Sequence, residues 1–227
     1  MLGRILTSGL IAGAVAGFCA AVLQLLFIQP VLLHAELYEG GELVHFGAAS
    51  SPADPPEFGL DPVRDGLSVI FSMLTYAGYA LILVALMALA EGRGAVISLR
   101  NGMLWGVAGF VAVLLAPAFS LAPEVPGVAA ADILPRQVWW FATVFSAGAA
   151  MWLLAFGQGW LAWGAAAVLL LAPHVIGAPE PGSFSGPAPT ELGALFAARV
   201  LGAGLVSWAV LGLFSAALWS SDDERAS

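Results

Sequence analysis

The side chains that could do chemistry in this sequence are histidines and carboxylates at the ends of its apolar segments. The candidates are His34, Glu36, Glu39, His45, Glu124, His174 and Glu180. Imidazole suits cobalt, nickel, copper and zinc, whereas carboxylate suits harder ions. A transported ion needs weak, exchangeable ligands rather than a closed cage, because it must also leave. These residue types therefore indicate a divalent metal cation as the substrate.

His174 is the most specific of these candidates because it directly follows Pro173. Proline has no backbone amide hydrogen, so Pro173 should kink or end a helix and free backbone groups there. An imidazole at such a place is either an ion ligand or gate, or a cap for the free carbonyls. The sequence leaves both interpretations open.

The carboxylates also have two interpretations. Glu36 and Glu39 stand three residues apart, so on a helix they lie on neighbouring faces, close to His34. That set is either a group of ligands or a solvated helix end. Glu124 and Glu180 either contact the metal or pair with two arginines at the same surface. The predicted metal-contacting residues are His34, Glu36, Glu39, Glu124, His174 and Glu180.

Composition assigns the chain to the membrane. Of its 227 residues, 60% are hydrophobic and only 10% are charged, whereas about a quarter of a soluble domain is charged. Uncharged apolar stretches of about 20 residues recur, which is the length needed to cross the hydrocarbon of a lipid bilayer. The net charge of −8 argues against nucleic acid, whose binding needs basic patches. The sequence predicts an all-α integral membrane protein.

Six spans are expected to form one transmembrane domain over residues 1–227. They cover about residues 5–33, 67–90, 101–121, 138–156, 160–178 and 200–219. Arginines near the span ends weakly favour an N-terminus on the cytoplasmic side. The acidic connection 34–66 is then external. The single cysteine, Cys19, excludes an intramolecular disulfide.

Small and amide side chains mark the first span. Gly9, Gly13 and Gly17 stand four apart, which is the pattern of a close helix–helix approach. Gln24 and Gln29 follow, and a buried amide needs a hydrogen-bond partner, so they either join helices or line a pathway. The residues assigned to the pathway or to packing are Gln24, Gln29, Arg136, Gln137 and Arg199.

One motif occurs twice. Leu-Ala-Pro at residues 115–117 is followed by Ala-Pro-Glu at 122–124 and Pro-Gly at 126–127. Leu-Ala-Pro at 171–173 is followed by Ala-Pro-Glu at 178–180 and Pro-Gly at 181–182. Each copy stands where an apolar run gives way to a turn. The pattern predicts a parallel internal repeat of two-helix units.

Catalytic patterns are missing from the sequence. It contains no nucleophile–base pair, no glycine-rich phosphate loop, no His-Glu-x-x-His and no pair of intramembrane histidines for haem. We therefore expect neither an enzyme nor a resident cofactor. Two functions remain: a transporter subunit for a divalent cation, and a non-transporting scaffold that binds a partner through its small-residue stripe.

The chain resembles the CbtA family of predicted cobalt transporter subunits. The resemblance rests on residues 115–127, on Arg-Gln-Val-Trp-Trp at 136–140, on residues 172–179, and on the amino-terminal run that ends in His-Ala-Glu-Leu-Tyr-Glu at 34–39. Its motifs carry over to Glu36, Glu39, Pro123, Glu124, Arg136, Gln137, His174 and Pro179. Members often have more histidines in the first external connection than this chain, which has only His45 there.

The resemblance implies a biological role. It implies a multi-pass protein of the bacterial inner membrane that takes up cobalt for cobalamin synthesis. It also implies a small one-span partner, CbtB, with a histidine-bearing tail. The transported ion would be Co²⁺.

Overall fold

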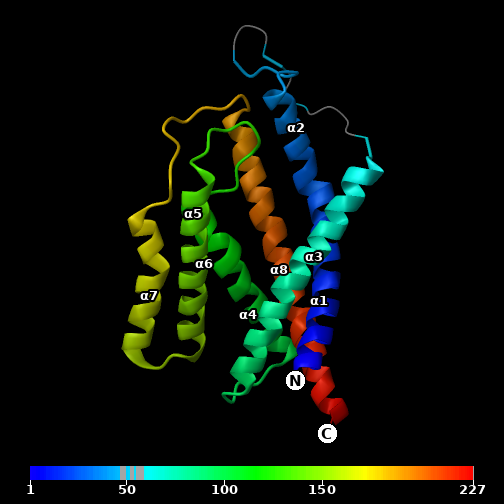
Figure 1. Cartoon of the computed structure of the whole chain (residues 1–227), viewed down its shortest axis with the longest axis vertical. Coiled ribbons are helices and arrows are strands. Elements are labelled where there is room, and N and C mark those ends of the chain that lie inside the picture. The colour runs from blue at the N-terminus through cyan, green and yellow to red at the C-terminus, as the bar shows by residue number, and fades with distance from the viewer. Residues whose placement is uncertain (47–49, 52–53, 55–58, 227) are drawn as a thin grey trace. The chain divides into compact units, whose positions relative to one another are not determined.

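The structure is a computed structural model that describes residues 1–46, 50–51, 54 and 59–226, and its regular elements there are all helices (Figure 1). In chain order they are α1 (Leu2–Leu23), η1 (Gln24–Ile28), α2 (Gln29–Glu39), α3 (Pro62–Glu91), α4 (Leu99–Phe110), η2 (Val111–Leu115), α5 (Ala116–Ser120), α6 (Ile133–Phe156), α7 (Gly159–Ile176) and α8 (Thr190–Ala226). The elements η1 and η2 are short π-helices.

In the part of the chain that the structure describes, six helical segments are long and apolar enough to cross a membrane. They are Leu2–Glu39, Pro62–Glu91, Leu99–Ser120, Ile133–Phe156, Gly159–Ile176 and Thr190–Ser220. The prediction of an all-α protein with six spans is confirmed. The first span continues through His34 to Glu39, so the start of the acidic connection is helical.

The described chain forms two compact units. Unit 1 contains Met1–Leu26, Gly59–Phe110 and Gly202–Ser227, and unit 2 contains Phe27–Phe58 and Val111–Leu201. The sequence gives no sign of this division, because the chain passes between the units inside helical spans as well as in a connection. The third predicted span is divided between the two units, since α4 belongs to unit 1 and α5 to unit 2.

In unit 1, glycine brings α1 against α3. A Cβ atom added at Gly13 would lie 2.4 Å from the Cα of Ala77, and one added at Gly17 would lie 2.5 Å from the Cα of Met73. Real Cβ atoms do not approach backbone that closely, so only glycine fits. The predicted small-residue stripe therefore packs against a helix of the same chain.

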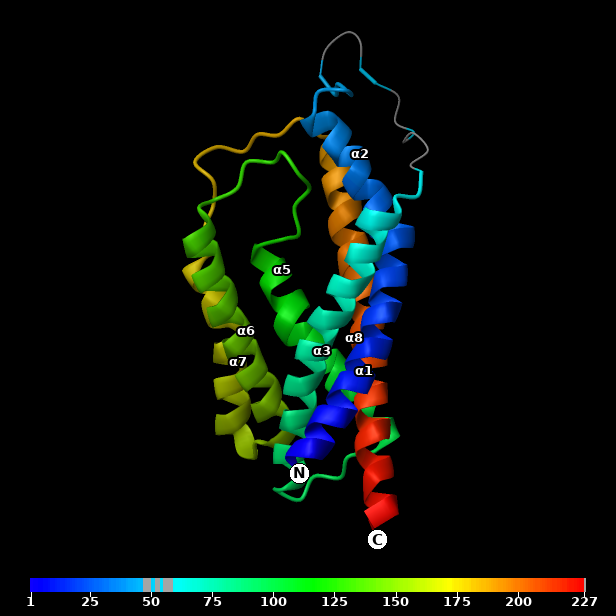
Figure 2. The same cartoon turned by 45° about the vertical axis from the view of Figure 1, so that its right-hand side comes forward.

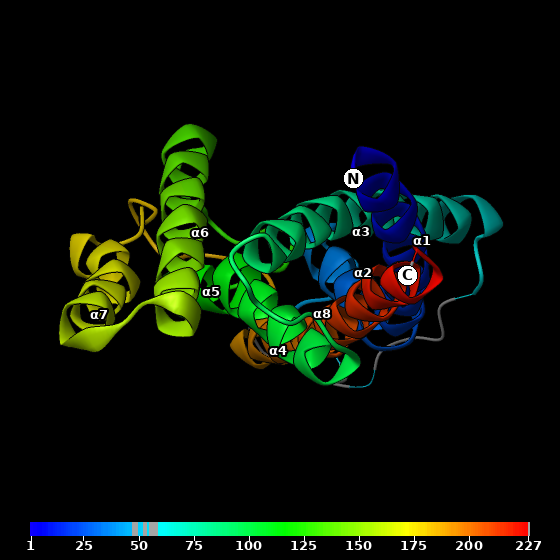
Figure 3. The same cartoon turned by 90° about the horizontal axis from the view of Figure 1, so that it is seen from below.

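A second glycine contact in unit 1 joins α4 to α8, which lie side by side in the view from below (Figure 3). A Cβ atom at Gly106 would lie 2.1 Å from the carbonyl oxygen of Trp208, and one at Gly102 would lie 2.7 Å from the Cβ of Ala216. Gly212 of α8 faces the same contact. Close backbone approach is the way that membrane helices gain packing without a hydrophobic driving force.

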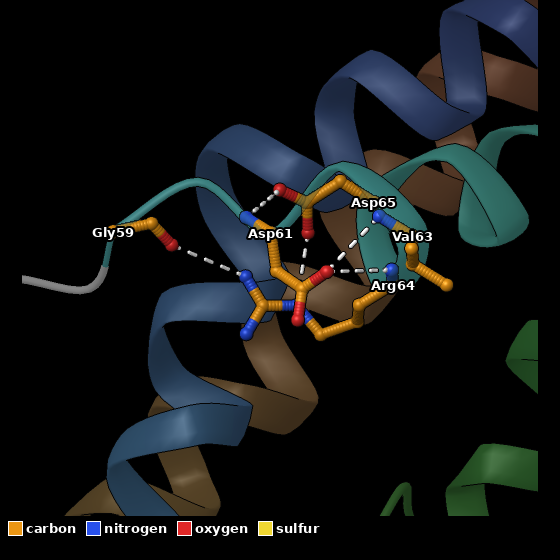
Figure 4. A network of polar contacts seen from close by, with 5 residues as sticks. All are labelled: Gly59, Asp61, Val63, Arg64 and Asp65. Carbon is orange, nitrogen blue, oxygen red and sulfur yellow. Dashed lines mark hydrogen bonds and ion pairs between the residues drawn. The ribbon is translucent and has the colours of Figure 1, made fainter.

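Two acidic residues, Asp61 just before α3 and Asp65 in its first turn, fix the start of this helix (Figure 4). The Asp61 carboxylate accepts hydrogen bonds from the backbone N–H groups of Val63 and Arg64, at 3.0 and 3.1 Å. The Asp65 carboxylate accepts from the Asp61 N–H at 3.1 Å and pairs with the Arg64 guanidinium at 2.9 Å. These carboxylates satisfy free donors of the first helical turn, so they have structural roles.

In unit 2, α6 and α7 run antiparallel beside α5 (Figure 2). A separate cluster packs α2 against the connections and the start of α8. Its buried members are Val31, Ala35, Tyr38, Val125 and Leu192. The connection after α5 and the one after α7 are joined directly, because the Ala129 N–H donates to the Ser185 carbonyl at 2.8 Å.

Prolines set the irregular points of these helices. Pro30 follows η1 by two residues and Pro117 follows η2 by two residues. A proline cannot donate to the carbonyl one turn earlier, so it interrupts the regular hydrogen bonding of its helix. Pro173 lies instead inside the last turn of a regular helix, α7.

Candidate functional site

The site is built around His174, which unit 2 holds on three sides. Its Nδ1 lies 2.8 Å from the Oγ of Ser120. The ring of Phe119 stands edge-on at 5.0 Å between centroids, and the ring of Trp139 stands edge-on at 6.0 Å. Ser120 is the last residue of α5 and His174 lies in the last turn of α7. Two helix ends therefore fix the imidazole.

The carbonyls around Pro173 already have partners. Because Pro173 has no N–H, the carbonyl of Leu169 one turn earlier loses its helical donor. The Oγ of Ser146, on α6, donates to that carbonyl at 2.5 Å. The carbonyl of Pro173 accepts from the indole N–H of Trp139 at 3.1 Å and from the Gly177 N–H at 3.1 Å. Capping of these carbonyls falls to Ser146 and Trp139, and His174 bonds to Ser120 instead.

The apolar groove between α6 and α7 is not a cation site of its own. Val138 and Ile176 are among its lining residues, with Ser146, Trp139 and Pro173. The hydroxyl of Ser146 and the indole N–H of Trp139 both donate to helix carbonyls. Its polar side chains are thus committed to the helix that Pro173 interrupts.

The two copies of the proline motif end alike but start differently. Each helix ends three residues after its proline, and the next N–H, of Leu121 or Gly177, donates to the proline carbonyl. Pro117, however, follows a π-helix, whereas Pro173 does not. Gly127 has a φ of +78°, and its counterpart Gly182 is not in that region. The predicted internal repeat is not confirmed.

One of the two anticipated ion pairs is present. Arg136, near the start of α6, pairs with Glu124 at 2.6 Å. Arg199 of α8 donates to the carbonyl of Phe27 at 2.8 Å instead of pairing with Glu180. Phe27 belongs to the π-helix η1, so the guanidinium satisfies a backbone carbonyl at a helix irregularity. Gln137 is exposed.

His34, Glu36 and Glu39 do not form one set. His34 is 6% exposed, with its ring 5.4 Å from that of Tyr38, and its Nε2 has no hydrogen-bond partner among the described residues. Glu36 and Glu39 are exposed on the same helix. The stem of Glu39 contacts Gly127, where an added Cβ would lie 3.2 Å from it. The helix thus separates the imidazole from the carboxylates.

The glutamines of the first span are placed in different surroundings. The Oε1 of Gln24 accepts from the Ser72 hydroxyl of α3 at 3.4 Å, within unit 1. Gln29 is 9% exposed and belongs to unit 2. For Gln24 this contact agrees with the packing interpretation, a hydrogen bond between helices. Glu180 is exposed in the connection that follows α7.

The predicted donors do not gather into a cage. Across residues 1–46, 50–51, 54 and 59–226, no three histidine, cysteine, aspartate or glutamate side chains lie close enough to hold a metal ion. His45 has a ring contact with Phe46, and their centroids are 4.7 Å apart. What unit 2 offers is the imidazole of His174, held by a described hydrogen bond, together with exposed carboxylates at helix ends and in connections.

Sequence reasoning missed the residues that hold His174. Ser120, Phe119 and Ser146 belong to no predicted site, and Trp139 entered only as part of the Arg-Gln-Val-Trp-Trp run at 136–140. Ser120 stands three residues after Pro117, at the helix end that this proline predicts. Nothing in the sequence shows that this helix end meets the end of α7.

A comparison with protein families gives a match that includes this site and nearly the whole chain. The sequence model described as "Probable cobalt transporter subunit (CbtA)" matches residues 2–220. The chain belongs to the CbtA family. No curated protein and no solved structure gives a significant match. With its six apolar helices, this CbtA member is a multi-pass membrane protein of a family of transporter subunits.

Proposed function

We propose that this chain carries Co²⁺ inward across the bacterial cytoplasmic membrane, to supply cobalamin synthesis. The observation that carries the proposal is the match to the CbtA family over residues 2–220. The donor types support it, because imidazole and carboxylate together suit a borderline divalent cation. The lack of a closed cage among the described residues is compatible with an ion that must also leave.

In this proposal the ends of α2, α5 and α7 face the outside of the cell. Glu36, Glu39, Glu124 and Glu180 raise the local cation concentration there, since a surface of one charge sign attracts the opposite sign. His174 is the first nitrogen donor that the ion meets. Arg136 competes with the ion for Glu124, because the two side chains are paired at 2.6 Å.

Nucleotide hydrolysis by this chain does not drive transport in this proposal, because the sequence holds no phosphate-binding loop. The energy comes from a partner, an ion gradient or the membrane potential. The membrane potential alone favours inward movement of a doubly charged ion by about 4.6 kcal/mol per 100 mV, twice the value for one charge. As a subunit, the chain is proposed to work with a small one-span partner of the CbtB type.

Uptake of radioactive cobalt tests the transport function. Cells that make the wild-type chain with its partner should accumulate cobalt well above empty cells. We expect His174→Ala and the double variant Glu36→Gln/Glu39→Gln to lower that uptake at least several-fold. Glu42→Gln, a nearby exposed carboxylate outside the proposed set, is the control and should keep wild-type uptake. Wild-type uptake equal to that of empty cells would rule out transport.

The alternative function is a scaffold that binds a partner through its small-residue stripe, but this stripe is already covered. Gly13 and Gly17 already pack against Ala77 and Met73 of α3. If cells that produce the chain took up no more cobalt than empty cells, a partner-binding role through another face of the protein would be favoured.

A further inference from the structure

Ser120 is the one hydrogen-bond partner of His174 among the residues that the structure describes. The distance from its Oγ to Nδ1 is 2.8 Å, which is ordinary for such a bond. Phe119 and Trp139 stand edge-on to the ring and limit its rotation. Trp139 is itself anchored by its bond to the Pro173 carbonyl. The imidazole thus has a set orientation, with Nδ1 bound and Nε2 without a described partner.

The carbonyl ends of two helices favour a positive charge beside the His174 ring. Ser120 ends the span Leu99–Ser120, and His174 lies in the last turn of α7. The last carbonyls of a helix carry partial negative charge, and here two such ends meet at one imidazole. The donors that offset the carbonyls near Pro173 are neutral, from Ser146 and Trp139.

We propose that Ser120 is a positioning residue: its Oγ accepts the Nδ1–H of His174, so that the Nε2 lone pair faces the incoming Co²⁺. This inference rests on the proposed transport function. A neutral imidazole has one N–H and one acceptor nitrogen, and the bond made by one nitrogen decides which form the other takes. Histidines that bind metals commonly donate their second N–H to an oxygen in this way.

This arrangement leaves His174 with one nitrogen, Nε2, that is free to bind an ion. A single fixed nitrogen prefers cobalt, nickel, copper or zinc to magnesium and calcium, which take oxygen ligands. It also releases the ion readily, because no group of three histidine, cysteine, aspartate or glutamate side chains among the described residues forms a cage around it. Ser120 therefore contributes to ion selection without touching the ion.

Nitrogen NMR of the whole chain in lipid nanodiscs tests the tautomer directly. The sequence has only three histidines, so His34→Asn, His45→Asn and His174→Asn assign every signal. In alkaline buffer, we expect the proton of His174 on Nδ1 in the wild type. Ser120→Ala should give a mixture of tautomers, and Ser120→Thr should restore the wild-type form. Ser183→Ala, in the exposed connection after α7, is the control and should change nothing.

Addition of Zn²⁺, a diamagnetic probe, gives the second readout. We expect a shift at Nε2 of His174 in the wild type and in Ser120→Thr, and a weaker shift in Ser120→Ala. In cobalt uptake, Ser120→Ala should raise KM roughly tenfold, the lower range for loss of a partner to a ligating histidine. Ser120→Thr should stay close to the wild type.

The outcomes separate this inference from the transport function. A proton on Nε2 in the wild type, or an unchanged tautomer in Ser120→Ala, would overturn the role of Ser120 even if cobalt uptake is robust. An Nδ1 proton that depends on Ser120, in a chain that takes up no cobalt, would uphold the positioning and remove its proposed purpose.

Discussion

Unit 1 and unit 2 are built from the same apolar residue types but hold their helices by different means. In unit 1, glycines let backbones touch, as at Gly13 against Ala77 and Gly106 against Trp208. In unit 2, prolines interrupt helices, and polar side chains from neighbouring helices bind the carbonyls that lose their donors, as Ser146 does at Leu169. Close packing tolerates no added atom, whereas a capped interruption depends on one hydrogen bond.

The two units also differ in the predicted roles of their polar residues. All six predicted metal-contacting residues belong to unit 2. Helix ends in that unit bring polar groups to imidazole and carboxylate side chains. Gln24, in unit 1, makes a helix-to-helix hydrogen bond with Ser72. Helix interruption by proline, which costs stability, thus occurs in the unit that holds the residues proposed to contact the ion.

The largest expected effect is on a glycine contact of unit 1. Gly106→Ala places a Cβ atom 2.1 Å from a backbone oxygen of α8, so the two helices must separate. We expect the free energy of unfolding to fall by about 3 kcal/mol, the upper range for overpacking. Denaturant titration in mixed micelles measures it.

Gly78→Ala is the matched control for this change. Nothing lies within 4 Å of an added Cβ at Gly78 on α3. This substitution should be neutral or stabilising by about 0.5–1 kcal/mol, because alanine loses less backbone freedom than glycine. Equal destabilisation by the two variants would contradict the close packing assigned to unit 1.

The next effect concerns the capped interruption of unit 2. Ser146→Ala leaves the Leu169 carbonyl without a donor, and we expect a loss of about 1–2 kcal/mol. In a Pro173→Ala background the restored amide can serve that carbonyl, so removal of Ser146 should cost about 1 kcal/mol less. A double-mutant cycle in micelles measures this coupling.

Thr75→Val gives the comparison from unit 1. Thr75 also donates to a carbonyl, that of Phe71 at 2.9 Å, but no proline removes the helical donor there. We expect a change within about 0.5 kcal/mol, as for substitutions away from special features. Additive costs in the Ser146 and Pro173 cycle would show that Ser146 does not replace the missing amide.

The smallest effect belongs to the ion pair of Arg136 and Glu124. Their side chains are 27% and 33% exposed, so water screens the pair. Glu124→Gln should lower the free energy of unfolding by less than about 1 kcal/mol. The difference should shrink as salt is added. Glu180→Gln is the control, and a larger loss there would show a contact that the described structure lacks.

The sequence by itself determined the properties that are local. Hydropathy is summed over neighbouring residues, so the six spans were predictable. Proline acts on its own helix, so the helix ends after Pro117 and Pro173 were predictable as well. The glycine stripe at Gly13 and Gly17 indicated a close helix contact without naming its partner.

Tertiary structure alone decided which distant groups meet. Ser120 and His174 are 54 positions apart, and Arg199 reaches a carbonyl 172 positions away. No local pattern specifies such pairs, because each depends on the packing of helices from different parts of the chain. Tertiary packing also decided which face of α2 is covered: it buries the imidazole of His34 and leaves the carboxylates of Glu36 and Glu39 exposed.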